Sequence, residues 1–396
     1  MQLVAYGAQD IYLTGNPQIT FFKVVYRRHT NFSMESIEQT WNGTSTANGR
    51  CTATVSRNGD LVHKMYVEVA GTLAGATANP GVAWIKTVDL EIGGQRIDRQ
   101  SGAWMETWAE LTQPNPTGQT SEAGTNTAAS QVGATLFQNT AGHGGVDETN
   151  NNGAAVGYTV PLQFWFCRNA GLALPLIALQ YHEVKVILDH NIVTLFGAGP
   201  TNRLWADYIY LDTEERRRFA QVSHEYLIEQ VQEQALQAQN TNELNFNHPV
   251  KELIWTRTGG AAGALLSTSL LPPLGAGNLN NTFLLKLNGH DRFAARASTY
   301  FSRTQVLQHH SGYGGLNCGL GAGAGGTLGA SNDAICVYSF ALKPEEHQPS
   351  GTCNFSRIDN AQLVSNAAVV ANSLMFAVNY NVLRVMSGMG GLAYSN

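Results

Sequence analysis

Residues 206–221 of the chain read ADYIYLDTEERRRFAQ, and this stretch divides the sequence into two comparable halves. Its first part, residues 208–211, consists of aromatic and aliphatic side chains, which is typical of a β-strand. Its second part, residues 212–218, is the densest run of charge in a chain that is otherwise poor in charge. A strand that ends in a solvated, charged segment indicates a boundary between structural units.

The sequences on the two sides of this boundary resemble each other at three places, in the same order. The pairs are residues 90–97 with 285–293, 158–162 with 337–342, and 207–211 with 379–383. The offset between partners falls from 195 residues (289 minus 94) to about 180 and then to 172 (380 minus 208). An ordered, shrinking offset is expected if the second copy of a duplicated domain has shorter loops. We therefore predict a tandem duplication.

Length and composition agree with a β-rich protein that is covered by partners. A chain of 396 residues is long enough for two or three domains, each with its own core. Charged residues make up 13%, about half the usual share, while 43% of residues are hydrophobic. The 41 glycines suit a fold with many turns. A net charge of −5 gives no reason to expect binding to nucleic acid.

Cysteine usage and the N-terminal sequence bear on the cellular compartment. The five cysteines are scattered and include no C-x-x-C pair, which argues for a reducing compartment and against a disulfide framework. The first ten residues lack the basic and apolar regions of a signal peptide. No run of 18 apolar residues occurs, so we expect no membrane span and a soluble product made in the cytosol.

Alternation of apolar and polar side chains recurs at short intervals along the chain. Residues 65–69, 88–92 and 184–188 each show a period of two, the pattern of a half-buried strand. Repeated short strands joined by Gly and Asn turns predict an all-β antiparallel sandwich or barrel. We expect helix only near the chain ends and over residues 214–229.

Two long stretches interrupt the strand pattern. Residues 113–157 are polar and rich in Asn, Thr, Gly and Ala, and residues 311–333 are rich in Gly and Ala. Both follow an L-x-[IL]-x-G element and precede a strand that contains Tyr, so they occupy equivalent places in the duplication. We expect them to emerge from the same end of two sandwiches that lie side by side. Long loops are often functional, so this end is the candidate outward face.

Motifs that could bind a cofactor or metal are weak. Residues 321–326 satisfy G-x-G-x-x-G, but the next predicted element is a strand where a dinucleotide site needs a helix. His309 and His310, with Cys318 eight residues later, lack the second pair of ligands that structural zinc requires. We expect no cofactor and no metal.

The sequence also gives no sign of a catalytic centre. We find no G-x-S-x-G elbow, no P-loop and no H-E-x-x-H. Five acidic residues could supply a carboxylate pair, but they mostly alternate with apolar residues on predicted strands, which favours solvated strand faces. They are Asp60, Asp89, Glu91, Asp98 and Asp291. We therefore predict that the protein is not an enzyme.

Two other classes remain as alternatives, a β-sandwich carbohydrate-binding module and a glycan-processing enzyme. A lectin normally shows aromatic and carboxylate side chains together in its loops, and the two insertions contain no tryptophan. Four N-x-[ST] sequons occur, of which Asn280 and Asn42 are candidate glycosylation sites.

Several long stretches resemble the major capsid proteins of nucleocytoplasmic large DNA viruses, most closely those of chlorella viruses and other algal viruses. The longest covers residues 2–32, QLVAYGAQDIYLTGNPQITFFKVVYRRHTNF. The others are residues 56–61, 90–98, 171–184, 224–230, 244–249, 350–360 (SGTCNFSRIDN) and 380–391 (YNVLRVMSGMGG). The resemblance covers almost the full length in order and fails mainly in the two insertions and in residues 261–281.

The resemblance implies a fold and a domain division. It implies two tandem eight-stranded antiparallel jelly rolls, with the insertions on the outer face of the assembled particle. The expected parts are an N-terminal arm (1–26), a first jelly roll (27–212), a linker (213–224) and a second jelly roll (225–396).

The same resemblance implies an assembly. It implies a homotrimer with a pseudo-hexagonal outline that tiles the icosahedral shell of a double-stranded DNA virus, assembled in the host cytoplasm. Expected partners are further copies of the chain, neighbouring capsomers, and minor capsid and penton proteins. The shell would lie over an inner membrane without spanning it, with no direct contact to nucleic acid, no cofactor, and covalent glycans as a possible modification.

A cyclic trimer should use large, apolar contacts between copies, which accounts for the low charge. The charged residues that remain near the boundary are candidates for polar contacts at junctions between lobes or subunits. They are Arg27, Arg28, Glu214, Glu215, Arg216, Arg217 and Arg218.

Overall fold

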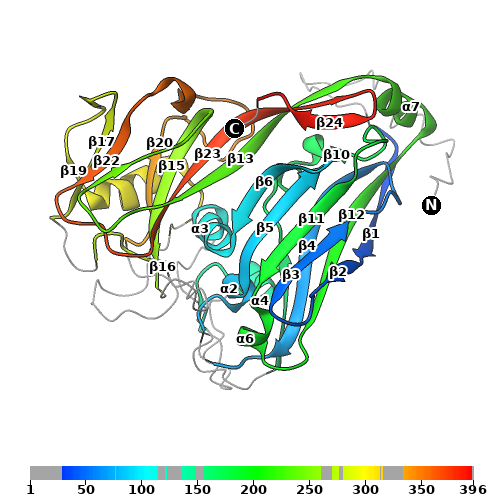
Figure 1. The fold of residues 1–396 in the computed structure, drawn as a ribbon, viewed down its shortest axis with the longest axis horizontal. Coiled ribbons are helices and arrows are strands. Elements are labelled where there is room, and N and C mark those ends of the chain that lie inside the picture. The colour runs from blue at the N-terminus through cyan, green and yellow to red at the C-terminus, as the bar shows by residue number, and fades with distance from the viewer. Residues whose placement is uncertain are drawn as a thin grey trace, which may run out of the picture.

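Antiparallel strands build most of the described chain, and they form two jelly rolls side by side (Figure 1). The structure is a computed structural model. It describes residues 29–75, 77–114, 121–122, 135–147, 155–259, 270–275, 280–312, 314 and 333–394. In that part of the chain, no helix is both long and apolar enough to cross a membrane.

The first jelly roll consists of two sheets. Sheet A contains β1 (Phe32–Gln39), β12 (Thr201–Leu211), β4 (Leu61–Thr72) and, both paired with β4, β9 (Ala155–Pro161) and β10 (Leu174–Pro175). Sheet B contains, in order, β2 (Trp41–Gly43), β3 (Gly49–Thr54), β11 (Val184–His190), β5 (Ile85–Ile92) and β6 (Gln95–Ser101). Strands β1, β12, β4 and β9 thus oppose β3, β11, β5 and β6, which makes eight principal strands.

The second jelly roll repeats this plan. Sheet D contains β13 (His224–Ala235), β23 (Ser373–Met386), β15 (Pro249–Thr258), β16 (Leu270–Leu271), β20 (Cys336–Ser339), β21 (Cys353–Asn354) and β24 (Met389–Leu392). Sheet E contains β14 (Thr241–Glu243), β22 (Ala361–Ser365), β17 (Thr282–Leu287), β18 (His290–Asp291) and β19 (Arg296–Ala297). A separate parallel pair joins β7 (Ser121–Glu122) to β8 (Val146–Asp147).

The strand order supports the predicted duplication. The three similar sequence pairs fall on strands with the same place in each roll: β5–β6 with β17–β18, β9 with β20, and β12 with β23. In sheet A, β12 lies between β1 and β4, and in sheet D, β23 lies between β13 and β15. The predicted all-β fold of two tandem jelly rolls is confirmed.

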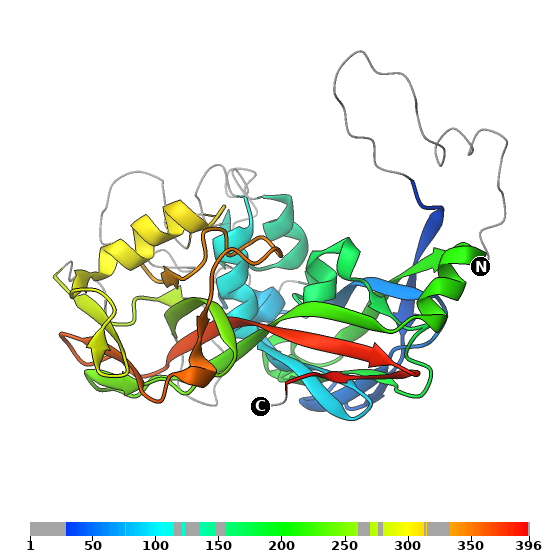
Figure 2. The same ribbon diagram turned by 90° about the horizontal axis from the view of Figure 1, so that it is seen from above.

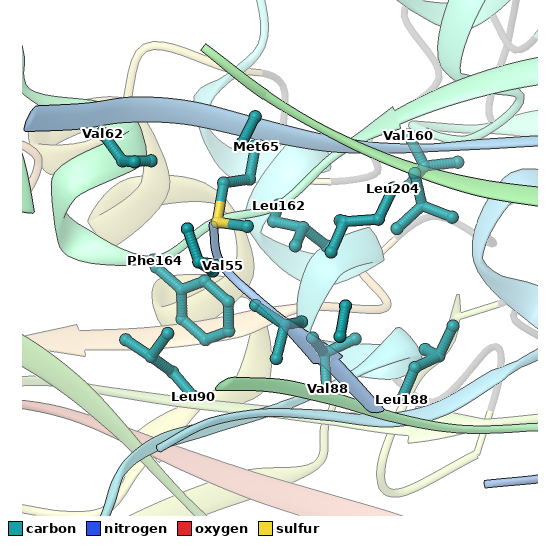
Figure 3. Packing of buried hydrophobic residues seen from close by; sticks show 14 of the residues in the cluster. Val55, Val62, Met65, Val88, Leu90, Val160, Leu162, Phe164, Leu188 and Leu204 are labelled. Carbon is teal, nitrogen blue, oxygen red and sulfur yellow. The ribbon is translucent and has the colours of Figure 1, made fainter. Parts of the chain in front are cut away.

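The core of the first roll lies between its two sheets (Figure 3). Val62, Met65 and Leu204 from sheet A are buried against Val88 and Leu90 from sheet B. Alternate residues of each strand point inward, which is why the period-two pattern was visible in the sequence. The second roll has an equivalent core that includes Trp255 and Phe283.

Helices differ from the expectation. The region predicted as helix over 214–229 is helical only in α7 (Thr213–Gln221), and β13 begins at His224. The longest helical segments that were not predicted are α3 (Gly102–Thr112) and η2 (Tyr300–Thr304), a π-helical turn that continues into α8 (Gln305–His309).

The remaining helical segments are short. They are α2 (Pro80–Ala83), α4 (Leu136–Ala141), α5 (Trp165–Arg168), η1 (Ala170–Leu172), α6 (Ile192–Phe196) and η3 (Phe355–Arg357).

The two insertions begin side by side. At the start of the second, the Gly312 and Gly314 amides donate to the carbonyl oxygens of Leu111 and Glu110 at 2.7 and 2.9 Å. The Ser311 hydroxyl donates to the Thr112 carbonyl oxygen at 3.1 Å. Helix α3, which ends where the first insertion starts, therefore anchors the start of the second. Most of both insertions lies outside the described residues.

Candidate functional site: the junction between the jelly rolls

Helix α3 belongs to the first roll in sequence but packs on the second roll in space (Figure 2, cyan). Its side chains Trp104, Trp108 and Leu111 join a buried cluster with residues of sheet D and α8. The ring centres of Trp104 and Phe376 of β23 are 5.3 Å apart. The Ser101 hydroxyl caps α3 by accepting from the Trp104 amide at 3.2 Å, so the helix starts where β6 ends.

Polar contacts between β6 and β13 extend this apolar junction. A carboxylate oxygen of Asp98 accepts from the Val231 amide at 3.1 Å, and the Gln230 side-chain amide donates to the Ile97 carbonyl oxygen. Burial raises the pKa of Asp98 to about 6, although hydrogen bonds from Val231 and Gln100 and the charge of Arg168 oppose that rise. The carboxylate is thus tied to both rolls.

A buried cluster of ion pairs lies beside α3. Arg168, the last residue of α5, reaches from the first roll to Glu229 of β13, with 3.0 Å between Nη2 and Oε2. Lys251 of β15 binds the other oxygen of Glu229 at 2.8 Å. The Arg168 guanidinium also lies 4.9 Å from the ring centre of Trp108. Burial would raise the pKa of Glu229, but Arg168, His347 and Lys251 outweigh it and lower the pKa to about 2.

His310 forms the second half of the cluster. Its Nε2 lies 3.1 Å from a carboxylate oxygen of Glu252, and its Nδ1 lies 3.1 Å from Glu345. Burial alone would lower the pKa of His310, but the two carboxylates raise it to about 9. The imidazole is therefore a cation at neutral pH.

The charges of this cluster balance one another. The basic members are Arg168, Lys251 and His310, and the acidic members are Glu229, Glu252 and Glu345. Buried charges are tolerated when each has a partner, whereas removal of one partner is strongly destabilising. Arg168 is the member that comes from the first roll. The cluster therefore fixes the position of one roll on the other, and its groups are engaged with one another.

This geometry corrects the expectation that the acidic residues lie on solvated strand faces. Asp60, Asp89 and Asp98 are each 3% exposed. Arg216 binds Asp60 at 2.8 Å, and Arg99 binds Asp89 through two bonds of 2.6 and 2.7 Å. Burial is possible because each carboxylate has a cationic or amide partner. Glu91 is half-buried and Asp291 is exposed.

Of the two adjacent histidines His309 and His310, only His310 forms ion pairs among the described residues. His310 is held by carboxylates, while His309 Nδ1 lies 3.2 Å from the Leu342 carbonyl oxygen. Among the residues that the structure describes, no group of three or more His, Cys, Asp or Glu side chains could hold a metal ion. Cys318 lies outside those residues.

The sequence-predicted contact residues lie away from this junction. Glu214 to Arg218 belong to α7, which Asp212 caps by accepting from the Glu215 amide at 3.0 Å. Arg216 forms an ion pair with Asp60 of the same chain. Glu214, Arg217 and Arg218 are exposed, and Glu215 is half-buried. Arg27 and Arg28 lie outside the described residues.

The two candidate glycosylation sites are both at the surface. Asn42 is exposed in β2, and Asn280 is exposed in the turn before β17. The cluster at the junction was not predicted from the sequence. The one signal in the sequence was the adjacent charged pair Lys251–Glu252, which interrupts the apolar first part of β15.

Two fused jelly rolls locked by a buried junction define a structural protein of the double jelly-roll class, and jelly rolls are common in viral shells. Comparisons with known proteins agree. The family described as "Major capsid protein N-terminus" matches residues 20–212, and "Large eukaryotic DNA virus major capsid protein" matches residues 215–391.

Individual relatives match over the full length. The chain is 50% identical to a major capsid protein of Pyramimonas orientalis virus and 41% identical to one of Paramecium bursaria Chlorella virus 1. Each alignment covers 100% of this chain and 99% of the relative. The solved PBCV-1 virus capsid chain superposes with a TM-score of 0.74 at 36% identity, covering 95% of this chain and 100% of that one.

The chain therefore belongs to the major capsid proteins of large eukaryotic DNA viruses. Its role is that of a structural capsid protein, and its relatives are capsid proteins and not enzymes.

Proposed function

We propose that three copies of the chain assemble into a pseudo-hexagonal capsomer and that these capsomers tile an icosahedral shell around double-stranded DNA. The observation that carries this proposal is the buried junction. It joins two similar rolls rigidly, so each copy contributes two similar lobes. Three copies related by a three-fold axis then present six lobes, which suits a lattice site with six neighbours.

The proposal includes a division of the chain. Residues 1–26 form an arm, 27–212 the first roll, 213–224 a linker and 225–396 the second roll. Support comes from β12, which ends at Leu211, and from β13, which begins at His224, with α7 between them.

The proposed partners follow from the shell. Further copies make the capsomer, and neighbouring capsomers, minor capsid proteins and penton proteins surround it, over an inner membrane that the chain does not span. Assembly takes place in the host cytoplasm. The adjacent starts of the two insertions support a common outward face for both, and Asn280 and Asn42 are the proposed glycan sites.

Polar contacts at subunit junctions are proposed for Arg27, Arg28 and the charges of α7. Arg217 and Arg218 offer the cleaner test, because Arg216 already binds Asp60 within the chain. Reversal of both charges, Arg217→Glu with Arg218→Glu, should weaken assembly. Unchanged assembly of this double variant in sedimentation velocity would remove α7 from the proposed contacts.

Negative-stain electron microscopy of purified protein tests the capsomer directly. We expect hexagonal top views with three-fold symmetry. Particles with only two lobes would overturn the proposal.

A further inference from the structure

Each roll has a helix at the same place in its strand order, but in the described part of the chain only the helix of the first roll packs on the outer face of a sheet in the other roll. In the first roll, α3 follows β6 and precedes an insertion, and it packs on the outer face of sheet D. The residues that it covers there include Ile254, Phe376 and Val378, all buried. In the second roll, η2–α8 follows β18 and β19 and precedes the other insertion, so it is the equivalent helix.

Helix η2–α8 has one covered side and one free side. Phe301 packs into the core of its own roll, and Val306 packs against α3. The next residue, Leu307, is 84% exposed, and the nearby Leu342 is 76% exposed. Trp104 and Trp108 of α3, by contrast, are almost fully buried. Figure 2 shows this helix (yellow) along the upper side of the second roll, whereas α3 (cyan) lies between the rolls.

The surface equivalent to the outer face of sheet D is the outer face of sheet A. Tyr66 of β4 and Trp205 of β12 form a cross-strand pair there, stacked with 6.4 Å between ring centres. Both are half-buried. Edge strand β1 lies on the side of the first roll away from the second (Figure 1). Aromatic side chains that are half-exposed and held in place are typical anchors of protein interfaces.

We propose that the side of η2–α8 that carries Leu307, together with Leu342, packs on the Tyr66–Trp205 face of sheet A in a second copy of the chain. The contact repeats between copies what α3 does with sheet D within a copy. It joins different surfaces, so it is heterologous, and a three-fold rotation closes it into a ring in which both surfaces of every copy are used. The inference rests on the proposed trimer and adds the surfaces that form it.

A photo-crosslinking amino acid at position 307 tests the pairing in the intact protein. We expect crosslinks between copies, mapped by mass spectrometry to peptides from β4 or β12. The same group at Leu136, a leucine of the first roll that is equally exposed at 83%, is the matched control and should give none to those strands. Crosslinks from position 307 to other surfaces, or none in a preparation that is trimeric, would overturn the inference.

A second measurement separates this inference from the proposed function. We expect the double variant Leu307→Asp, Leu342→Asp to dissociate at least tenfold more readily than the wild type, whereas Leu136→Asp keeps the wild-type mass. Because both leucines are exposed, circular dichroism should show an unchanged fold. A wild type that stays monomeric would defeat the trimer itself. A trimeric wild type with an equally trimeric double variant would defeat the pairing alone.

Mixing two variants tests whether the proposed contact is heterologous. We expect the double leucine variant and a Tyr66→Arg variant, each blocked on one surface, to form a dimer together through the two surfaces that remain. Failure of any mixed species to form, while the wild type is trimeric, would contradict the proposed pairing.

Discussion

Arg168 carries the charge that the first roll contributes to the buried cluster at the junction. It touches Glu229 through an ion pair of 3.0 Å and the ring of Trp108 through its guanidinium face. Without Arg168, the buried carboxylates of Glu229 and Glu252 and the partly exposed Glu345 would face Lys251, His310 and the partly exposed His347. The second roll therefore lacks one cationic partner for Glu229 unless the first roll is docked on it.

The substitution Arg168→Met should destabilise the protein by about 3 kcal/mol, because it leaves a buried carboxylate short of a partner. Urea unfolding measures the change in the free energy of unfolding. The control is Arg384→Met, which removes an ion pair to Glu225 whose partners are both more than half exposed. That control should cost less than about 1 kcal/mol. Equal effects of the two substitutions would contradict the role given to the cluster.

His310 should make the free energy of unfolding decrease as the pH becomes alkaline. Its pKa is about 9 in the folded chain and about 6.5 for the free side chain, so the folded state binds the proton more tightly. The stabilisation is complete below about pH 6.5 and is lost as pH rises through about 9, with a size of order 3 kcal/mol.

The comparison of wild type with His310→Gln isolates this effect. Unfolding free energies measured from pH 6 to pH 10 should fall for the wild type by more than they fall for His310→Gln. His309→Gln, one residue away, should follow the wild type. Parallel curves for wild type and His310→Gln would show that the imidazole carries no charge in the folded chain.

At this scale the sequence predicted little of the site. Local patterns identify which strand face a residue occupies, but they do not show which distant charge meets it. Arg168 and Glu229 are 61 residues apart (229 minus 168), and their pairing depends on how the rolls dock. Asp60 was expected in solvent because its partner Arg216 lies 156 residues away.

Among elements, α3 links the two rolls and the two insertions. One side of the helix packs on sheet D, and its last turn accepts hydrogen bonds from the Gly312 and Gly314 amides. The backbones approach so closely that a Cβ atom on Gly312 would lie 2.5 Å from the Glu110 carbonyl oxygen. Glycine is thus required where the start of the second insertion passes the end of α3.

The substitution Gly312→Ala should destabilise the protein by about 1–3 kcal/mol, since backbone atoms have to move apart. Thermal unfolding provides the measurement. Gly157→Ala in β9 is the matched control, because a Cβ there meets its nearest neighbour at 3.7 Å, an ordinary contact. A melting temperature of Gly312→Ala that equals that of Gly157→Ala would refute the close approach.

Strands could be predicted from sequence better than helices. Alternation identified β4, β5 and β11 because each has one face in the core. Helix α3 was missed because nearly every side chain in it is buried, so no polar face marks its period. For β13, the spacing of Glu225, Glu229 and Glu233 resembles a helix face, but pairing with β23 along its full length decides the structure.

For the whole molecule, the junction makes one unit of two similar rolls. The apolar cluster around α3 and the ion pairs beside it join residues from both rolls, and Leu383 and Val385 of β23 also pack into the first core. We expect the two rolls to unfold together. Calorimetry should give one transition whose calorimetric and van't Hoff enthalpies agree. Two resolved transitions in the wild type would mean that the rolls are independent.

The duplication was visible in sequence because equivalent strands keep similar patterns. The proposed homotrimer was expected from the family resemblance and not from the strand patterns, since contacts between copies leave no period in the sequence of one chain.

The native mass of the purified protein, measured by light scattering over a range of concentrations, tests the central claim most directly. The account predicts a constant mass near three times the chain mass of 42.7 kDa, about 128 kDa. A constant mass near 42.7 kDa would contradict it, because a monomer leaves the six-lobed capsomer without a basis.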